Sequence, residues 1–167
     1  MRLARDIEFE NYTNGKGIRM VIWNQGCKVH CPGCHNPETW NLKDGKDFKI
    51  DYLKSKIKEH FQKHCGITLS GGDPFLQPQE NKELAIYAHS LGLNVWIYSG
   101  QLFEKLKEDK DTLELLKNCD VLVDGPFILN QRDITLPFKG SPNQRIIDIQ
   151  KSLEKNKIVL YIKWRLP

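Results

Sequence analysis

Long apolar runs are missing from this sequence. Nowhere do about eighteen apolar residues follow one another, which is the length that a membrane-spanning helix requires. The N-terminal residues MRLARDIEFENY carry charges but have no apolar stretch behind them, unlike a secretory signal peptide. We therefore expect neither a membrane span nor a secretory signal.

A strong excess of one charge is missing as well. The 167 residues include 25 basic and 21 acidic ones, a net charge of +4, and the two signs interleave. The charge pattern therefore predicts no binding to nucleic acid. Low-complexity tracts and fixed repeats are also absent. With 40% apolar and 28% charged residues, the composition is that of one soluble globular domain over residues 1–167.

Cysteine is infrequent and its number is odd. The five are Cys27, Cys31, Cys34, Cys65 and Cys119, and the first three lie within eight residues. A secreted disulfide scaffold usually has an even number of cysteines in a shorter chain, so we expect a reducing, cytoplasmic location. A cysteine cluster in that setting indicates metal or redox chemistry. The two remaining cysteines are predicted to be small buried hydrophobes.

Apolar, β-branched segments alternate with amphipathic ones along the chain. Predicted strands cover residues 18–24, 66–70, 94–99, 120–124, 145–149 and 158–164. Predicted helices cover residues 51–63, 79–91 and 102–118, the last with a break near 109–111. The alternation predicts an α/β fold, and a complete eight-unit barrel needs roughly 250 residues. We therefore expect a partial (open) βα barrel, with a mostly parallel sheet of five to six strands and helices outside.

Polar or glycine-rich loops follow four of the predicted strands. These loops contain residues 27–34, 70–74, 98–100 and 124–126. In parallel sheets, the loops at the carboxyl ends of the strands form the binding site. We therefore expect these four loops to meet.

The cysteine loop has the spacing CxxxCxxC and predicts a metal centre. A 4Fe-4S cluster usually takes four thiolates, so with three one iron would remain open to a substrate. The alternative is a structural zinc site with His30 or His35 as the fourth ligand. Structural zinc sites more often have a second, distant pair of cysteines. The spacing therefore favours an iron–sulfur cluster modestly.

The loop Ser70-Gly71-Gly72-Asp73 allows two interpretations. Its glycines let a ligand approach the backbone, and the Asp73 carboxylate can accept from an ammonium group. The same residues are typical of a plain turn, and alone the turn is the better interpretation.

Five other polar residues, in three loops, are weaker candidates. Ser99 can bind a ligand hydroxyl or carboxylate, or cap a helix. Asp124 precedes Gly-Pro, where a turn residue is as plausible as a site residue. Asn143, Gln144 and Arg145 can bind a carboxylate or a partner's backbone, or form a solvated loop.

The CxxxCxxC loop directly after the first predicted strand resembles the signature of radical S-adenosylmethionine (SAM) enzymes. This resemblance implies that Cys27, Cys31 and Cys34 hold a 4Fe-4S cluster, and that the amino and carboxylate groups of SAM bind its fourth iron. Many members have an aromatic residue before the third cysteine. Here Gly33 stands there, and His35 is the candidate to replace it beside the adenine.

The resemblance extends to the later loops. Residues 70–73 resemble the motif that holds the methionine amino group, with Asp73 where the broad family has Glu, and Ser99 is implied to bind the ribose or the methionyl carboxylate. The residues expected to contact SAM are Gly33, Cys34, His35, Ser70, Gly71, Gly72, Asp73, Ser99, Asp124, Asn143 and Arg145.

Further motifs resemble the glycyl-radical activating enzymes of anaerobic ribonucleoside-triphosphate reductases. They are NGxGxR at 14–19, CPGC at 31–34, LSGGDP at 69–74, VDGPF at 123–127 and KGSxNQRIID at 139–148. The resemblance implies a flavodoxin-like electron donor, reductive cleavage of SAM and a glycyl radical on the large reductase subunit. The alternatives are a small radical SAM enzyme similar to pyruvate formate-lyase activase or to deazapurine synthases, or a non-catalytic zinc-binding adaptor.

Overall fold

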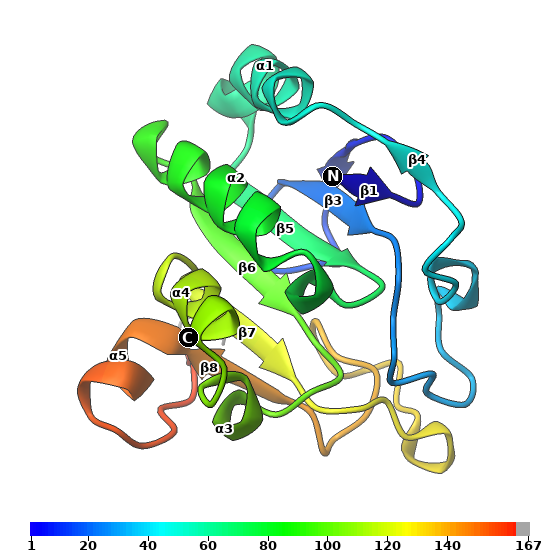
Figure 1. Ribbon diagram of the computed structural model, residues 1–167. Coiled ribbons are helices and arrows are strands. Elements are labelled where there is room, and N and C mark those ends of the chain that lie inside the picture. The colour runs from blue at the N-terminus through cyan, green and yellow to red at the C-terminus, as the bar shows by residue number, and fades with distance from the viewer. Residues whose placement is uncertain (163–167) are drawn as a thin grey trace.

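A computed structural model describes residues 1–162 and contains one sheet with helices packed against it (Figure 1). The strands are β1 (Arg2–Leu3), β2 (Glu8–Asn11), β3 (Arg19–Asn24), β4 (Lys46–Asp47), β5 (Gly66–Gly71), β6 (Asn94–Tyr98), β7 (Val121–Asp124) and β8 (Arg145–Asp148). Their order is β4-β1-β3-β5-β6-β7-β8, and β2 also pairs with β3. In the described part of the chain β4 and β8 are the two ends of this order, so the sheet is open.

The centre of the sheet is parallel and its edges are antiparallel. β3, β5, β6 and β7 pair in parallel, whereas β8 runs antiparallel to β7, and β1 and β2 run antiparallel to β3. The described residues therefore form eight strands, and the prediction of five to six was wrong. The three additional strands, β1, β2 and β4, have only two to four residues and carry charges, so they show no apolar alternation.

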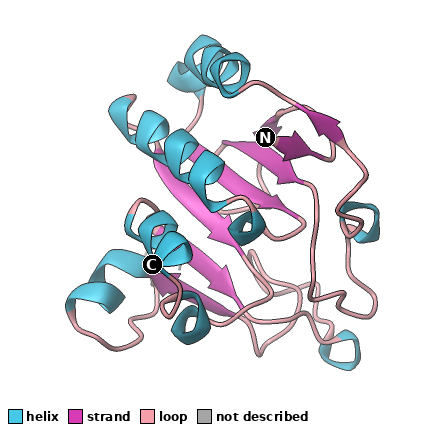
Figure 2. Cartoon of the chain, viewed as in Figure 1, coloured by secondary structure: helices cyan, strands magenta, loops and turns pink. Residues whose placement is uncertain are grey.

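The predicted helices are confirmed and lie on one face of the sheet (Figure 2). The helices are α1 (Ile50–His60), α2 (Pro78–Ser90), α3 (Phe103–Leu106), α4 (Lys110–Lys117) and α5 (Ile149–Glu154), with 3-10 turns at Pro37–Thr39, Phe61–Lys63, Pro74–Leu76 and Leu129–Gln131. The predicted break near 109–111 occurs because the Asp109 side chain caps α4, accepting from the Asp111 and Thr112 amides at 3.1 and 3.0 Å. α5 was not predicted.

Alternate residues of the central strands build the core on the helix side. Met20, Ile22, Ile67 and Leu69 have no exposed surface and belong to the same apolar cluster as residues of α1, α2 and α4. On the opposite face, Trp96 packs in a separate cluster with β7 and β8. Side chains along each central strand therefore alternate between the helix-side core and the opposite face.

Two predictions at the edges of the fold have mixed outcomes. Leu160 forms an isolated antiparallel bridge with Ile147, while the end of the predicted strand 158–164 lies outside the described residues. Cys119 is fully buried as predicted, whereas Cys65 is exposed and the prediction of its burial was wrong. No helix among residues 1–162 is both long and apolar enough to cross a membrane.

Candidate metal and cofactor site

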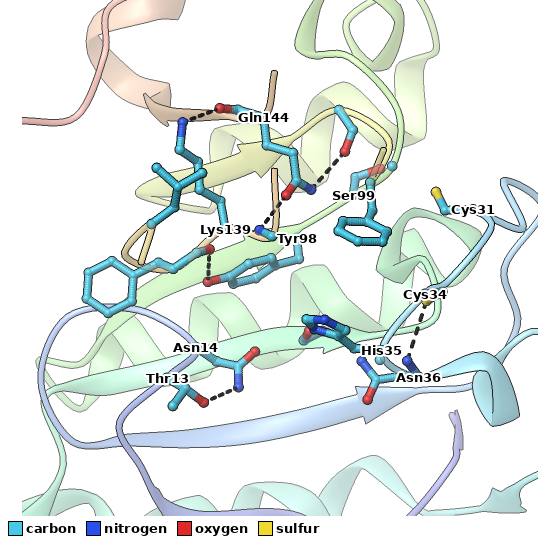
Figure 3. Close-up of a pocket in the computed structure, with 18 of the residues that line it drawn as sticks. Thr13, Asn14, Cys31, Cys34, His35, Asn36, Tyr98, Ser99, Lys139 and Gln144 are labelled. Carbon is cyan, nitrogen blue, oxygen red and sulfur yellow. Dashed lines mark hydrogen bonds between the residues drawn. The ribbon is translucent and has the colours of Figure 1, made fainter. Parts of the chain in front are cut away.

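A cavity of about 700 Å3 opens where the four parallel strands end (Figure 3). Its wall includes all three clustered cysteines and residues from the loops after β5, β6 and β7. The expectation that these four loops meet is therefore confirmed, because parallel strands bring their carboxyl ends to one edge. The volume lies within the range of small-molecule sites, roughly 300–1,000 Å3.

The cysteine loop follows β3 and is shaped by two left-handed residues. His30 and Gly33 have φ of 50° and 73°, and the Cys34 amide donates to the Cys31 carbonyl at 3.0 Å. A Cβ on Gly33 would lie 2.6 Å from a methyl group of Leu129. Leu129 is 51% exposed and can move aside, so it is the left-handed backbone that favours glycine at position 33.

Burial and backbone amides act in opposite directions on the cysteine sulfurs. Burial raises the pKa of the Cys27 and Cys31 thiols, while a backbone hydrogen bond from Val29 lowers the pKa of Cys27. The Asn36 amide donates to Cys34 Sγ at 3.4 Å (Figure 3). Such donors stabilise thiolates, which are the form that binds iron.

The donor set fits an iron–sulfur cluster. Within residues 1–162, no group of three His, Cys, Asp or Glu side chains is placed to hold a single metal ion. A cluster makes a different demand, because each thiolate binds its own iron. Three half-buried thiols on the wall of one cavity, with backbone donors beside them, meet that demand.

The loop of residues 70–73, called the glycine loop from here on, crosses the chain that leads into the cysteine loop. Gly71 has φ of 97°, and a Cβ on Gly72 would lie 2.1 Å from the Gly26 carbonyl oxygen. The Gly72 amide donates to the Asn24 carbonyl at 2.8 Å, and the Asp73 amide donates to the Gly26 carbonyl at 2.7 Å. The glycines are therefore needed for contact between two backbones, and Gly71 and Gly72 also line the cavity.

Asp73 lies behind the cavity wall. Its carboxylate is 2% exposed and accepts from the Phe75 amide, Ser99 Oγ and Gln101 Nε2 at 3.0–3.2 Å. Burial raises the pKa of this carboxyl group. Ser70 and Ser99 line the cavity, whereas Asp73 is not part of its wall. Asp73 therefore holds Ser99 and the neighbouring loop from behind.

Asp124 and Arg145 are paired with each other outside the cavity wall. Asp124 is fully buried, accepts from the Phe103 amide at 2.8 Å and forms a two-point ion pair with Arg145. Arg145 also donates to both carboxylate oxygens of Glu104, at 3.0 and 2.8 Å, and this lowers the pKa of Glu104 to about 2. The pair joins the end of β7 to β8.

Gln144 lines the cavity, while its neighbour Asn143 is exposed. Gln144 Oε1 accepts from the Gly140 amide at 2.8 Å and its Nε2 donates to the Gly125 carbonyl at 3.0 Å (Figure 3). Asn143 Nδ2 donates to the Pro126 carbonyl at 2.8 Å. Both amides therefore connect the loop before β8 to the loop after β7.

Tyr98, which belongs to one of the loops expected to form the binding site, shares the cavity wall with segments that were not predicted. Tyr98 lines the wall, and its hydroxyl donates to the Phe138 carbonyl at 2.9 Å (Figure 3). His35, which was predicted, lies on the same wall with its ring 5.6 Å from that of Phe127. The unpredicted wall segments are residues 12–14 and 132–140. Their positions result from tertiary contacts.

A buried arginine holds one of these unpredicted segments. Arg19 has no exposed surface, and burial lowers its pKa to about 10. Its Nε donates to Thr68 Oγ1 at 2.6 Å, and Thr68 Oγ1 donates to the Asn14 carbonyl at 2.7 Å. Arg19 Nη1 also donates to the Lys16 carbonyl at 3.1 Å. The glycine-rich segment before β3 is thereby attached to the sheet beside the cavity.

Comparisons with known proteins show which family this chain is similar to. A family model described as "4Fe-4S single cluster domain" matches residues 13–147. A protein of Enterobacteria phage T4 is 36% identical over 143 residues, covering 81% of this chain and 87% of the relative. Relatives from Escherichia coli K12 and Haemophilus influenzae are each 33% identical, covering 78% and 80% of this chain and 88% and 89% of their own lengths. All three are named anaerobic ribonucleoside-triphosphate reductase-activating protein.

Proposed function

The chain belongs to the family of anaerobic ribonucleoside-triphosphate reductase-activating proteins, and we propose that it is a radical SAM activase for the large subunit of such a reductase. The observation that carries this proposal is the cavity in which the three cysteines of CxxxCxxC meet the glycine loop after β5. We assign the open sheet with helices on one face to the partial βα barrel of this enzyme class.

Cys27, Cys31 and Cys34 are the proposed ligands of a 4Fe-4S cluster. A cluster held by these cysteines would supply one electron for reductive cleavage of SAM, the chemistry that would lead to hydrogen-atom removal from a glycine of the reductase. The backbone donors beside the sulfurs, such as the Asn36 amide at Cys34, stabilise the thiolates. A flavodoxin-like protein is the proposed donor of the electron.

The remaining predicted residues divide into two groups in this proposal. Ser70, Gly71, Gly72 and Ser99 contact SAM directly from the cavity wall, together with His35 and the backbone at Cys34. Gly33, the other predicted contact, is not part of this wall and shapes the cysteine loop through its left-handed backbone. Four others hold the wall in shape through hydrogen bonds and an ion pair that join neighbouring loops; they are Asp73, Asp124, Asn143 and Arg145. The second group therefore positions loops.

The open sheet suits a macromolecular substrate. A closed barrel would admit only a small molecule, whereas an open one leaves room beside the cavity for the segment of the reductase that carries its target glycine. The balanced charge favours a protein partner over nucleic acid, and the free cysteines favour a cytoplasmic location.

Cysteine substitutions test this proposal. The protein is purified and reconstituted without oxygen, reduced, and assayed with SAM for bound iron and for 5′-deoxyadenosine. We expect about four irons per chain, and Cys34→Ala should lose both the iron and the product. The matched control is Cys65→Ala, which removes an exposed thiol outside the cavity wall and should keep both. A colourless protein with one zinc, or equal damage in the two variants, would contradict the proposal.

A further inference from the structure

Trp40 has a buried donor without an acceptor. Its indole Nε1 is the one buried side-chain nitrogen or oxygen in residues 1–162 that has no hydrogen-bond partner there. Buried donors in folded proteins are bonded in the great majority of cases, and each exception calls for an explanation such as an absent ligand. The acceptor for this indole N–H is therefore expected to be a bound group that the protein itself does not supply.

The indole lies beside the cysteine loop. Trp40 lines the same cavity as the three cysteines, and its ring stacks on His30 of that loop, with centroids 4.9 Å apart and planes at 26°. The Trp40 carbonyl accepts from the Cys27 amide at 3.0 Å. Backbone and side chain thus attach Trp40 to the segment that begins the cluster motif.

An iron–sulfur cluster held in this cavity would provide the missing acceptor, because its sulfide and thiolate sulfurs would carry negative charge. We propose that the Trp40 indole N–H donates a hydrogen bond to a sulfur of the cluster and thereby raises its reduction potential. The inference rests on the proposed function. A donor stabilises the more negative, reduced cluster more strongly than the oxidised one, so its removal makes reduction harder. Trp40 is in this view a residue that tunes the cluster, not a ligand.

Trp23 offers a matched control on the same cavity wall. Its indole Nε1 already donates to Glu8 Oε2 at 3.0 Å, so it has no donor left for a cluster. Replacing either tryptophan with phenylalanine keeps an aromatic ring and removes one N–H group. Only Trp40→Phe removes a donor that lacks a protein acceptor.

The test is the midpoint potential of the reconstituted cluster, measured by redox titration with EPR detection. Trp40→Phe should bind as much iron as the unsubstituted protein and shift the reduction equilibrium about tenfold toward the oxidised state, which is about 59 mV more negative for a one-electron couple. Trp23→Phe should leave the potential in place. An unchanged potential in Trp40→Phe, or equal shifts in both variants, would overturn the inference.

A second measurement does not depend on how Trp40→Phe folds. The protein is labelled with 15N at the indole nitrogens of tryptophan, and the reduced cluster is studied by pulsed EPR. A 15N coupling that persists in Trp23→Phe supports the hydrogen bond, and the lack of any 15N coupling refutes it. An unsubstituted protein that binds no iron would instead refute the proposed function, which keeps the two failures distinct.

Discussion

Gly72→Ala should weaken the junction between the glycine loop and the cysteine loop. The new Cβ would lie 2.1 Å from the Gly26 carbonyl oxygen and 3.0 Å from the Thr39 carbonyl oxygen, and backbone atoms cannot rotate away. Overpacking typically costs about 1–3 kcal/mol. A backbone shift that relieves this overpacking would strain the hydrogen bonds from Gly72 to Asn24 and from Asp73 to Gly26, each worth about 1 kcal/mol. We expect the free energy of unfolding to fall by about 3 kcal/mol.

Urea denaturation of the cluster-free protein measures this loss. The matched control is Gly92→Ala, where φ is 77° but a Cβ would meet nothing within 4 Å, so only the backbone conformation costs energy, about 1–2 kcal/mol. Because Gly26 directly precedes Cys27, Gly72→Ala should also bind less iron after anaerobic reconstitution. If Gly72→Ala unfolded at the same urea concentration as the unsubstituted protein and bound as much iron, the close approach would not be what requires glycine.

Three further outcomes follow from the contacts around the cavity. Asp124→Asn should lower the free energy of unfolding by about 3 kcal/mol, because it breaks the ion pair between the buried Asp124 and the partly exposed Arg145. Glu104→Gln, at the exposed end of the same arginine, should lower it by less than about 1 kcal/mol. Urea denaturation at pH 7 compares the two variants, and equal losses would refute the larger contribution of Asp124. The pKa of Glu104 is lowered from 4.5 to about 2, so its contribution to stability is complete above pH 4.5 and is lost as the pH falls toward 2. Glu104→Gln should therefore flatten the dependence of the free energy of unfolding on pH between these values. An unchanged slope would contradict the pairing of Glu104 with Arg145. Ser99→Ala should raise the KM for SAM about tenfold in the 5′-deoxyadenosine assay, because one hydrogen bond to SAM is lost. Asp73→Asn should mainly reduce stability to urea, because Asp73 lies behind the wall and holds Ser99. The reverse pattern would make Asp73 the SAM contact and Ser99 the positioning residue.

Periodicity and turn chemistry predicted the central part of the fold. The strands β3, β5, β6 and β7 are buried apolar runs that end in glycine or polar loops, and such runs are recognisable without tertiary information. The edge strands were missed because short, charged segments acquire strand structure only by pairing with a neighbour. The six-residue helix α5 is likewise too short to show a helical period.

The site was predictable where topology alone positions a residue. Parallel strands bring the cysteine loop, the glycine loop and Ser99 to one edge, whatever their side chains do. Asp73, Asp124 and Arg145 differ, because a charged side chain turns toward the partner that tertiary packing supplies, and here those partners lie behind the wall. In the wall segment 132–140 only Lys139 and Gly140 belong to a motif, and residues 132–138 carry no signal that predicts their position.

The most direct test of the account is the EPR spectrum of the large reductase subunit after anaerobic incubation with this protein, SAM and a reductant. We expect a glycyl radical on the reductase that requires all of these components, formed together with 5′-deoxyadenosine, and absent when Cys34→Ala replaces the unsubstituted protein. A reductase that gains no radical from an iron-loaded, reduced protein would contradict the proposed function.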